Sequence, residues 1–139
     1  MEIHLFTGEY TGLNHSRTSA TLTDQEQDLL SVLLKKSEQD SELSKLLIFS
    51  RRSENYLTVS VGENYDFLRI KATPRALWFS VQPAPEDKQS PLLDCVEKKN
   101  LVHWKIKLNS LSDAERYADI VYRSALNAKK YYSKENKNV

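Results

Sequence analysis

The sequence contains a single cysteine and only three glycines among its 139 residues. One cysteine, Cys95, excludes an intrachain disulfide and any zinc site built from several cysteines. The glycines Gly8, Gly12 and Gly62 are too scattered for a P-loop or a dinucleotide-binding fingerprint. The histidines lie far apart, and no Gly-x-Ser-x-Gly nucleophile motif occurs. We therefore expect a protein that is not an enzyme and that holds no cofactor or metal.

Long apolar runs are also missing. No stretch approaches the roughly 20 apolar residues that a membrane-spanning helix needs, and residues 1–20 carry charged side chains that a signal peptide would lack. We expect no membrane partner and a cytoplasmic location, where a lone cysteine stays reduced. The length and the 40% hydrophobic content fit one domain over residues 1–139 with a modest core.

The charge of the chain is nearly balanced but unevenly distributed. Residues 1–44 hold 8 acidic and 3 basic side chains, a balance of −5, whereas residues 45–139 hold 11 and 17, a balance of +6. A basic remainder suits an anionic partner, and it equally suits a mixed, solvated surface. Composition leaves both interpretations open.

Strand patterns dominate the middle of the chain. Residues 56–82 alternate apolar and polar side chains with period 2, which is typical of two or three half-buried antiparallel strands separated by turns. Shorter alternating or apolar stretches predict further strands at residues 1–6, 46–49 and 101–109. In the last of these, Val102 and Trp104 are expected to point inward.

Two longer helices are predicted, each with a capping box and an apolar stripe. The first begins at Thr23 with Glu26 three residues later, and the second begins at Ser112 with Glu115. A short helix is expected over residues 90–97, where Cys95 is a small, partly buried side chain. The remaining segments are predicted to be a mobile loop at 7–22, a polar connection at 37–44 and a disordered tail at 133–139.

This order of elements predicts an α+β fold. The antiparallel sheet has about five strands, the two longer helices pack on one of its faces, and one short helix connects the elements. The other face of the sheet is then the main candidate for function.

That second face is predicted to mix cations with aromatic rings. If Leu77 and Phe79 point inward, Trp78 must point outward. Cations can neutralise phosphates and rings can stack on bases, so this face could bind single-stranded nucleic acid. A protein interface or an ordinary solvated face fits the same pattern. The candidate binding residues are Tyr56, Phe67, Arg69, Lys71, Trp78, His103, Lys105 and Lys107.

A metal-dependent nuclease is the enzyme class that the sequence excludes least, because its carboxylate ligands can be scattered along a chain. Asp66 lies close to Arg69 and Lys71, but Glu54, Glu63 and Asp66 all lie in or beside predicted turns. We interpret these acids as solvated turn residues and keep the nuclease as an alternative.

Three segments resemble a small accessory domain of Gram-positive bacteria and their phages. They are Asp66-Phe67-Leu68-Arg69-Ile70-Lys71, Arg75-Ala76-Leu77-Trp78-Phe79-Ser80 and His103-Trp104-Lys105 before a final helix. The resemblance covers residues 55–128 and carries no catalytic motif. That domain, of unknown function, sometimes accompanies exonuclease or other DNA-processing domains, so the resemblance implies a bacterial or phage setting and an accessory role.

The sequence therefore predicts a non-catalytic binding or regulatory domain that acts through the basic and aromatic sheet face. Its expected partner is single-stranded nucleic acid or a nucleic-acid-processing protein. The first alternative is a protein-interaction module or inhibitor, including a self-dimer, without nucleic-acid contact. The second is the metal-dependent nuclease.

Overall fold

The fold is α+β, as the sequence predicts, and the described residues form one antiparallel sheet of six strands. The computed structural model describes residues 22–53, 56–94, 96–99 and 102–136. The strands follow the spatial order β1-β2-β3-β4-β6-β5, and each pairs antiparallel with its neighbour. Their bounds are Leu47–Ser53 (β1), Tyr56–Val61 (β2), Tyr65–Ala72 (β3), Leu77–Val81 (β4), Glu97–Lys99 (β5) and His103–Lys107 (β6).

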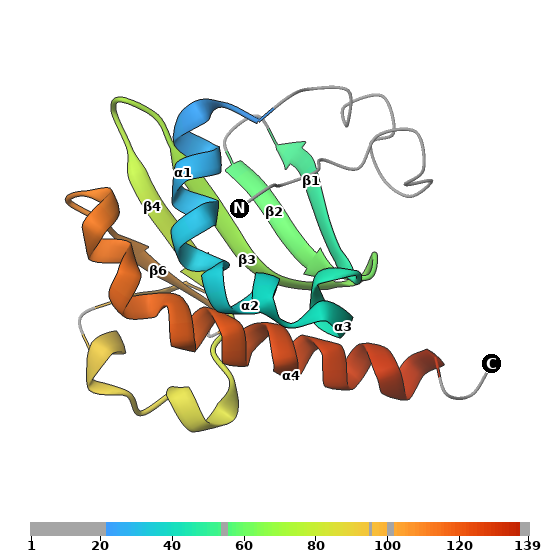
Figure 1. Cartoon of the computed structure of the whole chain (residues 1–139). Helices are drawn as coiled ribbons and strands as arrows, with labels where there is room; N and C mark the ends of the chain where they lie inside the picture. Colours follow the sequence, from blue (N-terminus) through green and yellow to red (C-terminus); the bar gives the residue numbers. More distant parts are fainter. Residues whose placement is uncertain (1–21, 54–55, 95, 100–101, 137–139) are drawn as a thin grey trace.

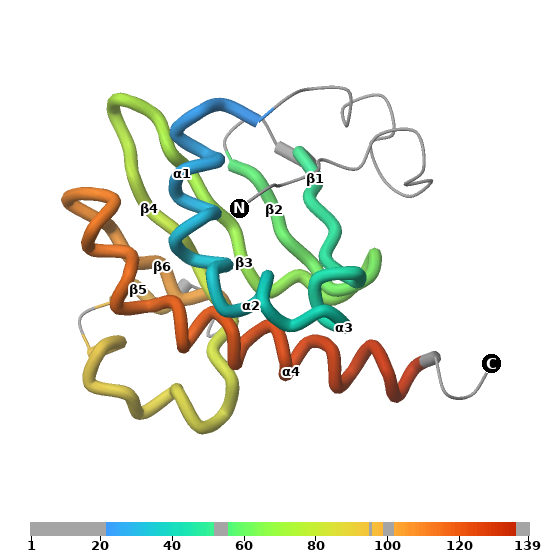
Figure 2. The backbone as a smooth tube through the Cα atoms, viewed as in Figure 1, coloured from blue at the N-terminus to red at the C-terminus, as the bar shows by residue number. Residues whose placement is uncertain are grey.

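The helices lie on one face of this sheet, with α1 and α4 crossing in front of the strands (Figure 1). The tube view shows α2 and α3 continuing from α1 towards the start of β1 (Figure 2). No helix in the described ranges is both long and apolar enough to span a membrane. The helix bounds are Asp24–Leu33 (α1), Lys35–Gln39 (α2), Ser41–Ser44 (α3), Ala118–Asn136 (α4) and the 3₁₀ helices Pro85–Asp87 (η2), Pro91–Leu93 (η3) and Leu111–Tyr117 (η4).

The start of α1 confirms the predicted capping box. The Thr23 hydroxyl accepts from the Glu26 backbone N–H at 3.1 Å, and the Glu26 carboxylate accepts from the Thr23 N–H at 2.9 Å. Arg51 of β1 donates to the same carboxylate at 2.6 Å. Burial raises the pKa of Glu26, but the hydrogen bonds from Arg51 and Thr23 outweigh it and the net pKa is lowered. The cap therefore also ties α1 to the edge of the sheet.

The sheet register places most of the apolar strand positions on the helix side, while Ile48 and Trp78 lie on the other face. Leu57, Ile70, Phe79 and Ile106 lie opposite one another across four strands, and each is buried. In the neighbouring row of core residues, Val81 of β4 lies opposite Trp104 of β6, which is only 6% exposed. The predicted inequivalence of the two tryptophans is confirmed: Trp104 lies in the core, and Trp78 is half-buried on the opposite face.

One β-bulge corrects the prediction for Phe67. Val59 pairs with Leu68, but the next residue on β2, Ser60, pairs with Asp66, so Phe67 is an extra residue with no partner on β2. The extra residue turns the Phe67 ring towards the helices, where it is 1% exposed within the core cluster. The strict alternation that placed Phe67 outward does not hold at this point.

Several predicted boundaries are wrong. Residues 37–44 are largely helical instead of a polar connection, and α4 includes residues 133–136, which were expected to be disordered. The expected helix at 90–97 is a 3₁₀ turn followed by β5. Val102 is 48% exposed because β6 begins only at His103. The predicted strand at 1–6, the loop residues 7–21, Cys95 and residues 137–139 lie outside the described residues.

The second capping box lies two residues earlier than predicted. The Asp113 carboxylate accepts from the backbone N–H groups of Asn109 and Ser110, so Ser110 is the cap instead of Ser112. The segment that follows is the 3₁₀ helix η4, which leads directly into α4. The sequence pattern could not distinguish the two serines, because each has an acidic residue three positions later.

A tight contact between the β2–β3 turn and α4 fixes the position of the helix. Gly62 has φ +63°, a conformation that costs most L-residues roughly 1–2 kcal/mol. A Cβ at this position would lie 2.5 Å from Cε1 of Tyr132. Glycine is thus required both by the backbone conformation and by the Tyr132 ring.

We expect Gly62→Ala to lower the free energy of unfolding by more than the roughly 1–2 kcal/mol of backbone strain alone. In a Tyr132→Ala background the same substitution should cost only the strain, because the ring is gone. Chemical denaturation of the four proteins of this cycle measures the coupling. Equal costs in both backgrounds would show that the turn and α4 are not in contact.

The packing of α4 supports a second prediction. Val121 is 0% exposed in the core, so Val121→Asp should bury an unpaired charge and cost at least ~3 kcal/mol. Lys130→Asp, at an exposed position of the same helix, is the matched control and should leave thermal stability nearly unchanged. A melting temperature of Val121→Asp equal to that of the control would mean that α4 packs through another face.

Candidate functional site

The structure brings together every predicted binding residue except Phe67. We call this surface the outer face: it is the side of the sheet opposite the helices. Register pairs connect its residues across the strands, with Trp78 lying between Lys71 and Lys107. The residues of the outer face are Tyr56, Arg69, Lys71, Trp78, His103, Lys105 and Lys107.

Two aromatic rings lie close together on the outer face. The centroids of Tyr56 and Trp78 are 6.3 Å apart, and the rings are inclined at 53°. The guanidinium of Arg69 lies 5.1 Å from the Tyr56 centroid, and the Lys105 ammonium lies 4.7 Å from the Trp78 centroid. Each ring is therefore paired with a cation, an arrangement that holds the rings and the charges in fixed positions.

A row of polar side chains runs beside the rings across the whole sheet. In register order it consists of Ser50, Thr58, Arg69, Ser80 and Lys105, one each from β1, β2, β3, β4 and β6. The serine and threonine side chains of this row are buried. The row places Arg69 and Lys105 on either side of Ser80.

Buried polar atoms without a hydrogen-bond partner concentrate on this face. They include Ser50 Oγ, Thr58 Oγ1, Arg69 Nε and His103 Nδ1. Leaving a buried polar group unpaired costs roughly 1–3 kcal/mol, so native structures contain few of them. Within the described residues, these four atoms find no protein partner on this face.

The edge strand β5 adds an acidic residue that sequence reasoning missed. Glu97 lies opposite Lys105 in the register, and its carboxylate is 3.5 Å from the Lys107 ammonium. Both side chains of this ion pair are largely exposed, so it contributes little to stability and can be exchanged for another anion. Three residues, Glu97–Lys99, are too few for a period-2 pattern, which is why β5 gave no signal in the sequence.

A small hydrogen-bonded cluster lies at one end of the outer face. The Gln82 amide nitrogen donates to the backbone carbonyl of Asp66 at 2.7 Å and lies 3.3 Å from Nε2 of His103. Burial lowers the pKa of His103, and the positive charge of Arg69 lowers it further, while Asp66 opposes both effects. His103 is thus held neutral beside a strongly cationic surface.

The described residues contain no group of three or more His, Cys, Asp or Glu side chains arranged to hold a metal ion. Of the acids considered for a nuclease, Glu54 lies outside the described residues. Glu63 is exposed in the β2–β3 turn, and Asp66 is half-buried at the start of β3. The nuclease alternative therefore gains no geometric support from these residues.

No family model, no curated protein and no solved structure matches this chain.

The pKa of His103 gives a test of the electrostatics of this cluster. We expect the His103 ring to titrate below its ordinary value of about 6.5, because burial and Arg69 both disfavour the charged form. Arg69→Met should raise this pKa, and Asp66→Asn should lower it. Because the unfolded state binds the proton more readily, His103 should reduce the free energy of unfolding as the pH falls below about 6.5.

Proton NMR titration of the histidine rings measures these shifts, with His103→Gln used to assign the signal. Lys130→Met removes a charge from the other side of the molecule and serves as the control that should leave the His103 pKa unchanged. A His103 pKa above the ordinary value, or an Arg69→Met variant in which it does not move, would contradict the proposed arrangement.

Proposed function

We propose that this protein is a non-catalytic binding domain that holds single-stranded nucleic acid on the outer face of its sheet. The observation that carries the proposal is the Tyr56–Trp78 ring pair, with Arg69 and Lys105 beside it at 5.1 and 4.7 Å. Rings for bases and cations for phosphates are the two components that single-strand binding needs, and here they share one surface.

The charges support an electrostatic contribution from the phosphates. Arg69 and Lys71 come from β3 and Lys105 and Lys107 from β6, the two strands that flank β4, and Glu97 faces the β6 lysines from β5. Phosphate binding releases condensed counterions, which favours association at low salt. A phosphate that displaced Glu97 from Lys107 would also replace a weak exposed ion pair with a stronger charge-assisted contact.

The rings supply the part of the interaction that does not depend on salt. A base stacked on an aromatic side chain contributes roughly 1–3 kcal/mol and is tolerated whatever its identity. Tyr56 and Trp78 lie on the same face of the sheet with their ring centroids 6.3 Å apart. We infer a binding mode with little sequence preference, because stacking and phosphate contacts read no base edges.

The setting of this activity follows from the resemblance of residues 55–128 to accessory domains of bacteria and phages. We infer that the protein acts in the cytoplasm beside enzymes that process DNA, with no chemistry of its own. The protein would have a regulatory role if binding kept the strand away from such an enzyme or delivered the strand to it.

Fluorescence of Trp78 tests the proposal in the full-length chain. In a Trp104→Phe background, a single-stranded oligonucleotide should quench Trp78, because a base stacks on its ring. Added salt should reverse the quenching. With three or four phosphates neutralised, a plot of log affinity against log salt should have a slope of about −2 to −3.

Charge-neutralising variants supply the matched comparison. Lys71→Gln and Lys105→Gln should each make that slope shallower by about 0.7, whereas Lys130→Gln on the exposed side of α4 should not change it. A Trp78 signal that is blue-shifted and shielded from iodide in a demonstrated monomer would refute the site. Exposed Trp78 emission that no oligonucleotide alters would favour the protein-interface alternative, which sedimentation tests as self-association.

Metal-dependent cleavage of the oligonucleotide by the pure protein, lost in Asp66→Asn, would instead establish the nuclease alternative. That outcome would replace the non-catalytic assignment. The same samples used for the fluorescence titration can be analysed for cleavage, so the two readings come from one experiment.

A further inference from the structure

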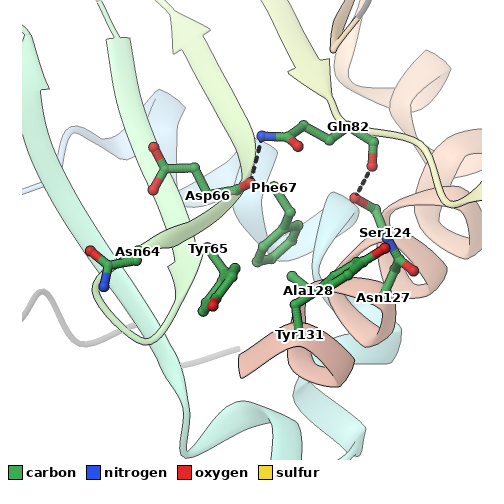
Figure 3. A pocket seen from close by; sticks show the side chains of 9 residues that line it. All are labelled: Asn64, Tyr65, Asp66, Phe67, Gln82, Ser124, Asn127, Ala128 and Tyr131. Atoms are coloured by element: carbon green, nitrogen blue, oxygen red, sulfur yellow. Dashed lines mark hydrogen bonds between the residues drawn. The ribbon is translucent and has the colours of Figure 1, made fainter. Parts of the chain in front are cut away.

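A pocket of about 240 Å³ lies at the end of the sheet, between the start of β3 and the middle of α4. In Figure 3 the residues from the strands lie on one side of this space and those from α4 on the other. Pockets for drug-sized molecules measure roughly 300–1,000 Å³, so this one suits a single small group. Its lining residues are Asn64, Tyr65, Asp66, Phe67, Gln82, Ser124, Asn127, Ala128 and Tyr131.

The polar part of the lining is rich in carboxamides. Asn64, Gln82 and Asn127 each carry a carbonyl acceptor and an amino donor in one plane. Paired donors and acceptors in a plane match the edges of nucleobases, which side-chain amides can contact with two hydrogen bonds. Gln82 is held in place, since its side-chain amide nitrogen donates to the backbone carbonyl of Asp66 and its backbone carbonyl accepts from the Ser124 hydroxyl (Figure 3).

The apolar part of the lining is aromatic. The Phe67 ring, which the β-bulge turns inward, lines the pocket together with Tyr65 and Tyr131. Tyr65 donates a hydrogen bond to Glu135 near the end of α4, and this bond raises the pKa of the Tyr65 hydroxyl. The contact fixes the Tyr65 ring, whereas Tyr131 is 51% exposed. Rings around a small planar space are suited to stacking on a flat heterocycle.

The charge of the pocket excludes a phosphate group. The described residues that line it include no lysine, arginine or histidine, and the Asp66 carboxylate points away from the space in Figure 3. Glu135 places a carboxylate beside Tyr65. A phosphate would meet no cation among the lining residues and would be repelled by Glu135, whereas the amino and imino N–H groups of a neutral base would be attracted by it.

The pocket and the outer face meet at Gln82. This residue lines the pocket, and its amide nitrogen lies 3.3 Å from Nε2 of His103 on the outer face. His103 in turn is electrostatically coupled to Arg69. The pocket and the outer face are therefore close to each other at this end of the sheet.

We propose that this pocket binds one unpaired nucleobase, and that the base is the terminal one of a strand held on the outer face. The claim that the pocket binds a nucleobase does not depend on the proposed function. The claim that this base ends a strand on the outer face rests on it. The terminal base enters the pocket between Tyr65 and Tyr131 and meets the amides of Asn127 and Gln82. Its phosphate stays outside, towards His103 and Arg69.

The test uses the full-length chain and side-chain amide signals in nitrogen-15 NMR spectra. Adenosine and cytidine at millimolar concentration should shift the amide signals of Asn127 and Gln82, and ribose alone should not. Asn127→Leu and Tyr131→Ala should each weaken nucleoside binding about tenfold, because each removes one set of base contacts. Asn109→Leu, at an exposed position outside the pocket, should bind nucleosides as the parent protein does.

Oligonucleotides distinguish a terminal base from a free nucleoside. A strand with intact ends should shift the pocket signals and quench Trp78, whereas a strand with abasic residues at both ends should only quench Trp78. Nucleosides that leave Asn127 unshifted, or a simple sugar that shifts it equally, would overturn the pocket assignment even if oligonucleotides quench Trp78. Nucleosides that bind the pocket while no oligonucleotide affects Trp78 would support the base site and refute the proposed function instead.

Discussion

The structure depends on one constraint, which is that the described helices cover only one face of the six-stranded sheet (Figure 1). Side chains alternate between the two faces of a strand, so a change of one residue in register would exchange the core with the outer face. The rows through Phe79 and Val81 bury apolar side chains from β2 to β6 on the helix side. The same register places the cations and Trp78 together on the other side.

Polar contacts then determine where the helices lie on that sheet. Arg51 joins the cap of α1 to β1, and Arg123 of α4 forms two hydrogen bonds to the buried Asp87 carboxylate of η2, at 2.8 and 2.9 Å. Tyr122 donates to Asp40 at 2.9 Å, which connects α4 to the start of α3. With the Gly62 turn at its far end, α4 is held at several points along its length, and this position creates the pocket beside β3.

The β-bulge at Phe67 connects the core to both candidate sites. The inserted residue sends the Phe67 ring into the pocket lining, and it keeps Asp66 opposite Ser60 next to the Gln82–His103 cluster. Bulges occur where a strand must redirect a side chain without losing its place in the sheet. Here the redirected ring lines an aromatic pocket on the helix side, while the cations lie on the outer face.

The sequence by itself determined the fold class, the cap of α1, the opposite orientation of the two tryptophans and the outward position of every predicted binding residue but Phe67. These features follow from local rules: period-2 alternation, capping chemistry and the sign of a side chain's charge. The cap at Ser110, the short strand β5 and the 3₁₀ segments could not be predicted, because their sequences are too short or too ambiguous for any periodicity. Only the tertiary structure decided the position of Phe67, the pairing of Glu97 with Lys107 and the pocket between β3 and α4. Each of these depends on residues that are distant in the sequence and meet only when the strands pair and α4 packs, which no local pattern encodes.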